Sequence, residues 1–134
     1  MSGKRLAWII AGVAGVALVT LLVATPTRQA RAHPAPRQGI TADRVWPASM
    51  VPNTPDAREA YAAARNAPQV LDGLYCHCDC SRHAGHRSLL TCFESDHGAH
   101  CDICIGEALL AERLAASGSS LEQIRNAIDA RFGS

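Results

Sequence analysis

Six cysteines within one short stretch constrain this 134-residue chain more than any other feature. A small chain with so many cysteines uses covalent or metal links in place of part of a hydrophobic core. Alternate residues lie on one face of an extended chain but point in different directions from a helix. The three alternating cysteines therefore predict an extended or looped segment, and the last pair, spaced three apart, predicts the first turn of a helix. In order, the cysteines are Cys76, Cys78, Cys80, Cys92, Cys101 and Cys104.

Thiolates that converge from a loop, a short helix and a helix N-terminus would form a soft-donor metal site. Such a site selects Cu(I), Zn(II) or an iron–sulfur centre over hard cations. We expect Cu(I), because a cluster of several ions tolerates dense Cys-x-Cys spacing, whereas a single tetrahedral Zn(II) needs only four ligands. Zn(II) is the second candidate. The predicted ligands are all six cysteines, Cys76, Cys78, Cys80, Cys92, Cys101 and Cys104.

Two alternatives use the same cysteines without a metal. An even number of cysteines in a small exported domain is typical of structural disulfides. In that case each alternating cysteine would pair with one of the three later ones, because the alternating cysteines are too close to pair comfortably with each other. The other alternative is an exported thiol–disulfide oxidoreductase, in which Cys101 is the nucleophile and Cys104 its partner.

The histidines add few ligands to this prediction. His100 lies one helical turn before the last cysteine, the spacing at which side chains meet, so it is a candidate ligand, and His97 ranks below it. His77 alternates with the cysteines and should point away from them. His83 and His86 are expected to be surface turn residues.

Charge and missing motifs exclude several functions. From His33 onward the chain has nine arginines and twelve acidic residues, a net charge of −3, so it offers no basic face for phosphates. Nucleic-acid binding is therefore not expected. The sequence also lacks a glycine-rich phosphate loop and an HExxH motif. We expect a binding protein, with a metal-donor or metal-acceptor protein as its partner, and not an enzyme.

The N-terminal residues predict a membrane address. Lys4 and Arg5 precede an uncharged apolar run, Leu6 to Ala24, which at about 1.5 Å per residue nearly crosses a hydrocarbon core of about 30 Å. Ala30-Arg31-Ala32 matches the A-x-A pattern of signal peptidase sites. Residues 1–25 are thus expected to be a transmembrane signal anchor or a signal peptide. Either outcome places the remaining chain outside the cytoplasm, at the cell surface or in the periplasm, anchored to the membrane or secreted.

Residues 26–53 are expected to form an extended linker, because they are rich in Pro, Arg, Ala and Gln. Trp46, Met50 and Val51 are apolar groups that could dock on the domain, or Trp46 could touch the membrane surface. A partly ordered strap is favoured. The remaining residues, 54–134, are expected to form one mainly α, cysteine-rich domain of short helices around an irregular Cys-x-Cys-x-Cys loop.

Helix signals divide this domain. Thr54 and Pro55 predict a helix start with a capping hydroxyl, and an alanine-rich stretch continues the helix to Asn66. A second helix over residues 100–117, closed by Gly118, should place two apolar stripes side by side. One stripe holds Ile103, Leu110 and Leu114, and the adjoining one holds Cys101, Cys104 and Ala108.

The last helix has the clearest start signal. Ser120 and Gln123 have the spacing of a capping box, and Leu121, Ile124 and Ile128 follow as its buried stripe.

Several segments together resemble the bacterial PCYCGC-motif family. They are residues 74–80, 88–93, 97–99 and 101–104 and the closing 124–129 helix; the resemblance spans residues 72–132 and includes all six cysteines. The chain departs from the name-giving string, since Tyr75 replaces Pro, His77 replaces Tyr and Asp79 replaces Gly. The resemblance implies an exported, membrane-associated protein of a family without an established activity, often a lipoprotein. No lipobox cysteine follows the apolar run here, so the helix itself would be the attachment.

Overall fold

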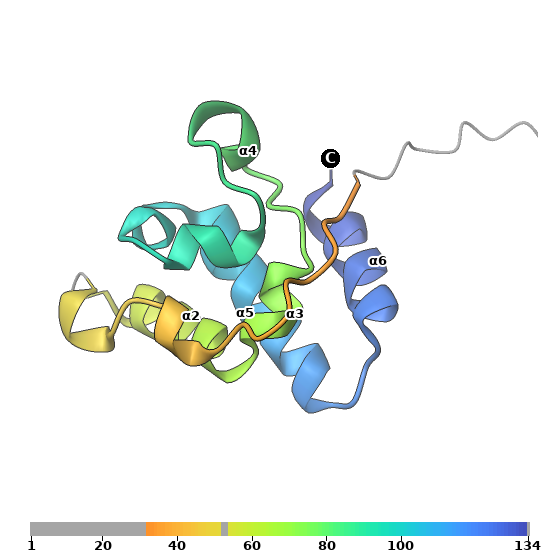
Figure 1. Cartoon of the computed structure of the whole chain (residues 1–134), viewed down its shortest axis with the longest axis horizontal. Coiled ribbons are helices and arrows are strands. Elements are labelled where there is room, and N and C mark those ends of the chain that lie inside the picture. Colours follow the sequence, from red (N-terminus) through yellow and green to blue (C-terminus); the bar gives the residue numbers. More distant parts are fainter. Residues whose placement is uncertain (1–31, 52–53, 134) are drawn as a thin grey trace, which may run out of the picture.

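The computed structural model describes residues 32–51 and 54–133. These residues form α-helices and 3-10 helices and no strands, which confirms the mainly α prediction (Figure 1). A cysteine-rich loop with a single short helix separates the early helices from the later ones. In chain order the elements are η1 (Ala42–Arg44), η2 (Ala48–Met50), α2 (Pro55–Asn66), α3 (Pro68–Asp72), α4 (Cys80–His83), η3 (Leu89–Phe93), η4 (His97–His100), α5 (Asp102–Ala116) and α6 (Leu121–Phe132).

Helix α5 is the centre of the fold, with α2 on one flank and α6 on another (Figure 1). Small side chains face each other where α2 meets α5: Ala57, Ala60 and Ala64 are fully buried, as are Ala108 and Ala111. Alanine on both helices lets their backbones approach closely and costs little side-chain entropy on burial. This choice of residues explains how a chain with few large apolar side chains builds a core.

The buried face of α5 differs from the predicted one. Ile103 is 39% exposed, whereas Cys104 and Glu107 are fully buried. The prediction placed the two stripes side by side; Leu110 and Leu114 of the aliphatic stripe pack partly buried against the core, whereas Cys104 and Ala108 of the other stripe are fully buried. The cysteines thereby enter the core of the fold.

Local capping signals mostly agree with the structure. Ser120 accepts a hydrogen bond from the backbone N–H of Gln123, and the side chain of Gln123 accepts one from the N–H of Ser120, so the capping box is confirmed. Gly118 has φ +86°, as expected for a residue that ends a helix. Thr54 occupies the predicted N-cap of α2, but its hydroxyl makes no capping hydrogen bond.

Residues 32–51 form a strap on the helices rather than a free linker. Ile40, Val45 and Val51 are buried in the core. Trp46 packs against the core partly buried, whereas Met50 is 54% exposed. The strap thus docks, as favoured, through two of the three side chains singled out from the sequence, Trp46 and Val51, and also through Ile40 and Val45.

The predicted membrane segment, residues 1–25, lies outside the described residues. Among the residues that are described, no helix is both long enough and apolar enough to cross a membrane.

Candidate metal centre

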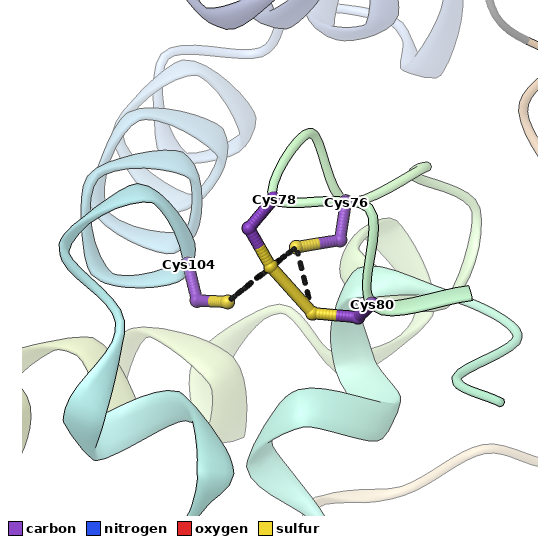
Figure 2. A group of neighbouring side chains, drawn as sticks. All are labelled: Cys76, Cys78, Cys80 and Cys104. Carbon is purple, nitrogen blue, oxygen red and sulfur yellow. Dashed lines mark hydrogen bonds between the residues drawn. A yellow bond between two sulfur atoms is a disulfide. The ribbon is translucent and has the colours of Figure 1, made fainter. Parts of the chain in front are cut away.

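A left-handed turn at Asp79 shapes the alternating-cysteine loop. Asp79 has φ 59° and ψ 28°, and its carboxylate accepts a 2.6 Å hydrogen bond from the hydroxyl of Tyr75. The turn brings the Cα atoms of Cys78 and Cys80 to 5.6 Å, whereas alternate residues of an extended chain lie about 6.6–7 Å apart. Their sulfur atoms form a disulfide (Figure 2). The expectation that alternating cysteines do not pair with each other is therefore wrong for this pair, because it assumed a more extended loop.

Four cysteines, Cys76, Cys78, Cys80 and Cys104, form what we call the thiol cluster (Figure 2). Three come from the loop, and Cys104 reaches them from the first turn of α5. The Sγ atom of Cys76 lies 3.4 Å from those of both Cys78 and Cys104, and the latter two lie 3.6 Å apart. The Sγ atom of Cys80 lies 3.7 Å from that of Cys76.

Separations of this size suit metal ligands. Thiolates around a tetrahedral ion lie about 3.8 Å from each other when each metal–sulfur bond is about 2.3 Å. Cys76, Cys80 and Cys104 are buried, and Cys78 is half-buried. The cluster is therefore a soft-donor site with little exposure to water.

A second set of donors adjoins the first and shares Cys80 with it. We call this set, Cys80, His86, Cys92 and His97, the mixed group. The Nε2 atom of His97 lies 3.2 Å from the Sγ atom of Cys80, and the Nδ1 atom of His86 lies 3.2 Å from that of Cys92. The two sulfur atoms lie 3.5 Å apart. Cys92 thus faces the same centre as the loop cysteines, as predicted.

Cys101 occupies a different position from the other five cysteines. It is the N-cap of α5, and its sulfur accepts a hydrogen bond from the backbone N–H of Cys104 at 3.4 Å. Its sulfur belongs to none of the donor groups found among the described residues. The structure therefore brings together five of the six predicted ligands.

The histidines are arranged differently from the prediction. His100 is 65% exposed in its side chain and lies 3.8 Å from the carboxylate of Asp96. His86, expected in a surface turn, is half-buried against a sulfur atom, and burial lowers its pKa. The helical spacing that favoured His100 does not apply, because residues 97–100 form a 3-10 helix that ends before α5 begins.

His77 points away from the sulfur atoms, as expected, and joins a buried polar network that the sequence did not indicate. Its backbone N–H and its Nδ1 atom lie 3.0 Å and 2.6 Å from Oε1 of Glu107, and its Nε2 atom lies 3.0 Å from Oδ1 of Asp129. Burial raises the pKa of Glu107 to about 8. The hydrogen bond to Glu107 raises the pKa of His77. This network fixes the loop residue between two cysteines to both α5 and α6.

Hydrogen bonds between the thiols shift the pKa values of Cys76 and Cys104 in opposite directions. Hydrogen bonds from Cys104 and Cys92 lower the pKa of Cys76 to about 3, against the opposing effect of burial. The hydrogen bonds with Cys76 and Cys92, followed by burial, raise the pKa of Cys104. Once Cys76 is ionised, further thiolates in the same buried space repel one another. A cation is the natural compensation, because it stabilises several adjacent thiolates at once.

His86 as a neighbour of sulfur and Glu107 as a buried acid were not predicted, and His97, ranked below His100 as a ligand, is the one of those two that lies beside sulfur. Their order along the chain is Cys80-x5-His86-x5-Cys92-x4-His97, which differs from the paired Cys-x-x-Cys and His-x3-5-His order of common zinc motifs. A zinc motif defined by two closely spaced cysteines and two closely spaced histidines does not match an order in which cysteine and histidine alternate. The available signal was the concentration of five histidines between Cys76 and Cys104.

The fold and the site define a small, cysteine-rich helical protein, in which three overlapping donor groups among the described residues could hold a metal ion. The chain belongs to a protein family described as "Protein of unknown function with PCYCGC motif", whose model matches residues 29–134. This match confirms the resemblance and extends it over the strap. No curated protein and no solved structure matches the chain.

The family's motif is consistent with the geometry of the loop. Asp79 stands where the motif has glycine, and its φ of 59° lies in the left-handed region that glycine adopts freely. Aspartate is among the few other residues that tolerate this region. The departure from the motif thus preserves the turn that gathers the cysteines.

Proposed function

We propose that this protein binds a thiophilic metal ion, Cu(I) in preference to Zn(II), in its thiol cluster, and that it sequesters the ion or passes it on. It acts by binding and not by catalysis. Soft thiolate ligands favour Cu(I), and the sulfur-only composition of the cluster is the chemical reason for the choice.

The observation that carries this proposal is the triangle of sulfur atoms from Cys76, Cys78 and Cys104. Their separations of 3.4–3.6 Å join a loop to a helix 26 and 28 residues farther along the chain. Side chains that only filled this space would be served equally well by alanine or valine, which bury without the competing ionisations of the free thiols Cys76 and Cys104. The convergence of sulfur from distant segments supports a ligand role.

The disulfide requires a reductive step before the full cluster can bind. A dithiol reductant gives two electrons and two protons to the Cys78–Cys80 bond, which breaks to two thiols while the reductant becomes a disulfide. The reduced loop then offers all of its sulfur atoms. Metal binding displaces the thiol protons.

The structural-disulfide alternative receives little support. It required three bridges between the loop and the later cysteines, but the one disulfide of the six described cysteines joins Cys78 to Cys80, and the other four are free. A bridge between residues two apart closes a very short loop, so it removes little entropy from the unfolded chain.

A thiol–disulfide oxidoreductase remains the second candidate because the free thiol of Cys104 lies 3.6 Å from the sulfur of Cys78. Attack by the Cys104 thiolate would form a Cys78–Cys104 bond and release the Cys80 thiolate, with no net change in oxidation. This version uses Cys104 with the loop pair, whereas the sequence had suggested Cys101 with Cys104. Metal binding is preferred because it uses all four sulfur atoms of the thiol cluster, whereas this exchange uses three of them.

An open pocket of about 390 Å³ beside the cluster offers a route for an ion or for a donor or acceptor protein. The apolar run of residues 6–24 supports delivery outside the cytoplasm and attachment to the membrane. Both the location and the partner are parts of the proposal. The pocket is lined by Cys78, His83, Asp96, His97, His100 and Cys101.

The test uses the full chain, purified in detergent micelles and reduced with a dithiol. Cu(I) is added under anaerobic conditions in competition with a chromogenic Cu(I) chelator, and copper per protein is counted after gel filtration. The proposal expects copper to stay with the protein. Retention of copper by a Cys76→Ser/Cys104→Ser variant at the wild-type level would contradict the assignment to the thiol cluster.

A further inference from the structure

We propose that the mixed group is a second metal site of different chemistry, which holds a borderline divalent cation, represented by Zn(II), with two sulfur and two nitrogen ligands. The inference rests on the proposed function in one respect, since Cys80 belongs to both donor sets. The two sites would then form a binuclear centre whose Cys80 thiolate lies between the two ions.

The distances within the mixed group suit a tetrahedral ion. With bonds of about 2.3 Å to sulfur and 2.0–2.1 Å to nitrogen, sulfur and nitrogen ligands lie about 3.5 Å apart. The Cys80–His97 and Cys92–His86 contacts are 3.2 Å, and the two sulfur atoms are 3.5 Å apart. All four donor atoms lie within 4.8 Å of one another. These three contacts are about 0.3 Å shorter than the tetrahedral separations, so a small spreading of the side chains would admit an ion.

The chain positions the four donors with local structure. Cys80 begins α4, and Gly85, with φ +68°, turns the chain so that the N–H of His86 meets the carbonyl of Cys80 at 3.2 Å. Cys92 is held by η3, whose Leu89, Leu90 and Phe93 are fully buried. The ligand atoms are therefore placed by packed segments rather than by free side chains.

The histidine rings are placed to supply nitrogen to the same point. The rings of His86 and His97 meet edge to face with centroids 4.6 Å apart, and each has a nitrogen directed at a different sulfur. Imidazole with thiolate favours zinc-type ions, whereas the sulfur-only cluster favours Cu(I). The composition of each set therefore predicts which ion it takes.

A rival arrangement replaces His86 and Cys92 by His83 and Cys78. His83 is exposed, and its ring lies 6.0 Å from that of His97 in a tilted orientation. The mixed group is preferred because both of its cysteines are fully buried and each has a histidine nitrogen at 3.2 Å.

The test uses the reduced full chain in detergent micelles, supplied with Zn(II) and Cu(I) together and freed of excess metal, with both metals counted per protein. A His86→Ala/His97→Ala variant should lose the zinc and keep the copper. A Cys76→Ser/Cys104→Ser variant should lose the copper and keep the zinc. His100→Ala is the matched control, because this histidine lies outside both donor sets, and it should keep both metals.

Zinc X-ray absorption of the unmutated protein provides a measurement that does not depend on a variant folding. The expected first shell has two sulfur ligands at about 2.3 Å and two nitrogen ligands at about 2.0 Å. Four sulfur ligands, or zinc retained by the double histidine variant, would overturn the second site and leave Cu(I) binding intact. Loss of zinc on His83→Ala with zinc kept in His86→Ala would assign the ion to the rival arrangement. Zinc bound as expected without any Cu(I) uptake would instead overturn the proposed function alone.

Discussion

The sulfur atoms of Cys76 and Cys104 lie 3.4 Å apart, although 28 residues separate them in the chain. This contact joins the alternating-cysteine loop to the first turn of α5, the helix at the centre of the fold. It also places Cys76, whose pKa is lowered, beside Cys104, whose pKa is raised by the hydrogen bonds between thiols. A bound cation would stabilise the thiolates of both cysteines. The same contact therefore belongs both to the packed core and to the proposed metal site.

Replacing Cys104 by serine should weaken Cu(I) binding. Serine keeps a similar size but exchanges a soft sulfur for a hard oxygen, which Cu(I) binds poorly. We expect affinity to fall by at least about tenfold, since changes even to groups outside the ligand set commonly cost 10–100-fold. Chelator competition measures the affinity, and circular dichroism checks that the helices remain. Unchanged affinity in a folded variant would remove Cys104 from the ligands.

Cys101 provides a matched control within the same helical turn. Its sulfur caps α5 and lies outside the donor groups, so Cys101→Ser should keep the full metal content. Serine is a preferred N-cap residue, so the free energy of unfolding should stay unchanged or rise by up to about 0.5 kcal/mol. Metal counting and urea unfolding measure the two effects. Loss of a copper equivalent would instead support the original six-cysteine ligand set.

Copper capacity should depend on the redox state of the loop. With the Cys78–Cys80 disulfide intact, the thiol cluster offers only the free thiols of Cys76 and Cys104. Prior treatment with a dithiol reductant should raise the copper retained per protein, whereas a Cys78→Ser/Cys80→Ser variant should not respond. Thiol counting before and after reduction accompanies the metal analysis. Equal copper uptake by the oxidised and reduced wild-type protein would exclude the loop pair as ligands.

Asp72 should make part of the free energy of unfolding depend on pH in the acid range. Its carboxylate is fully buried and receives hydrogen bonds from Arg37, Arg87 and Ser88. Burial raises its pKa, but the hydrogen bonds, those from Arg37 foremost, outweigh burial and hold the pKa below the usual value. The carboxylate therefore stabilises the fold above its unfolded pKa of about 3.9, and this stabilisation is lost as pH falls through the lower folded pKa.

Asp72→Asn should lower the free energy of unfolding at neutral pH by about 2 kcal/mol, because two arginines lose a charged partner. It should also reduce the loss of stability in acid. Glu59→Gln, at an exposed position on α2, is the control and should stay within about 0.5 kcal/mol of wild type. Urea unfolding from pH 2 to 7 measures both. If the free energy of unfolding of Asp72→Asn falls with decreasing pH as steeply as that of the wild type, Asp72 is not the source of the acid dependence.

Local signals in the sequence predicted much of the fold, because capping and turn residues act over a few positions. The Ser120–Gln123 capping box and the helix end at Gly118 follow directly from such residues. The docking of the strap through Ile40 and Val45 was harder to predict, because it depends on packing between segments far apart in the chain.

The candidate site likewise has features that local spacing predicts and features that depend on the tertiary fold. Cysteine spacing predicted a loop and a helical turn that supply sulfur to one centre, and five cysteines meet there. Spacing could not predict the left-handed turn at Asp79. Cys-x-Cys spacing is compatible with both an extended and a turned loop, and contacts with the rest of the fold decide between them. Nor could it predict that His86 lies beside sulfur, or that His97 does so in place of the favoured His100, because these positions depend on how η3 and η4 fold back on the loop.

Copper content of the reduced full chain, counted after gel filtration alongside Cys76→Ser/Cys104→Ser, tests the central claim most directly. The account predicts that the wild-type protein keeps Cu(I) against a chromogenic chelator and that the folded double variant loses it. A reduced, folded wild-type protein that leaves all of its Cu(I) with the chelator would contradict the account.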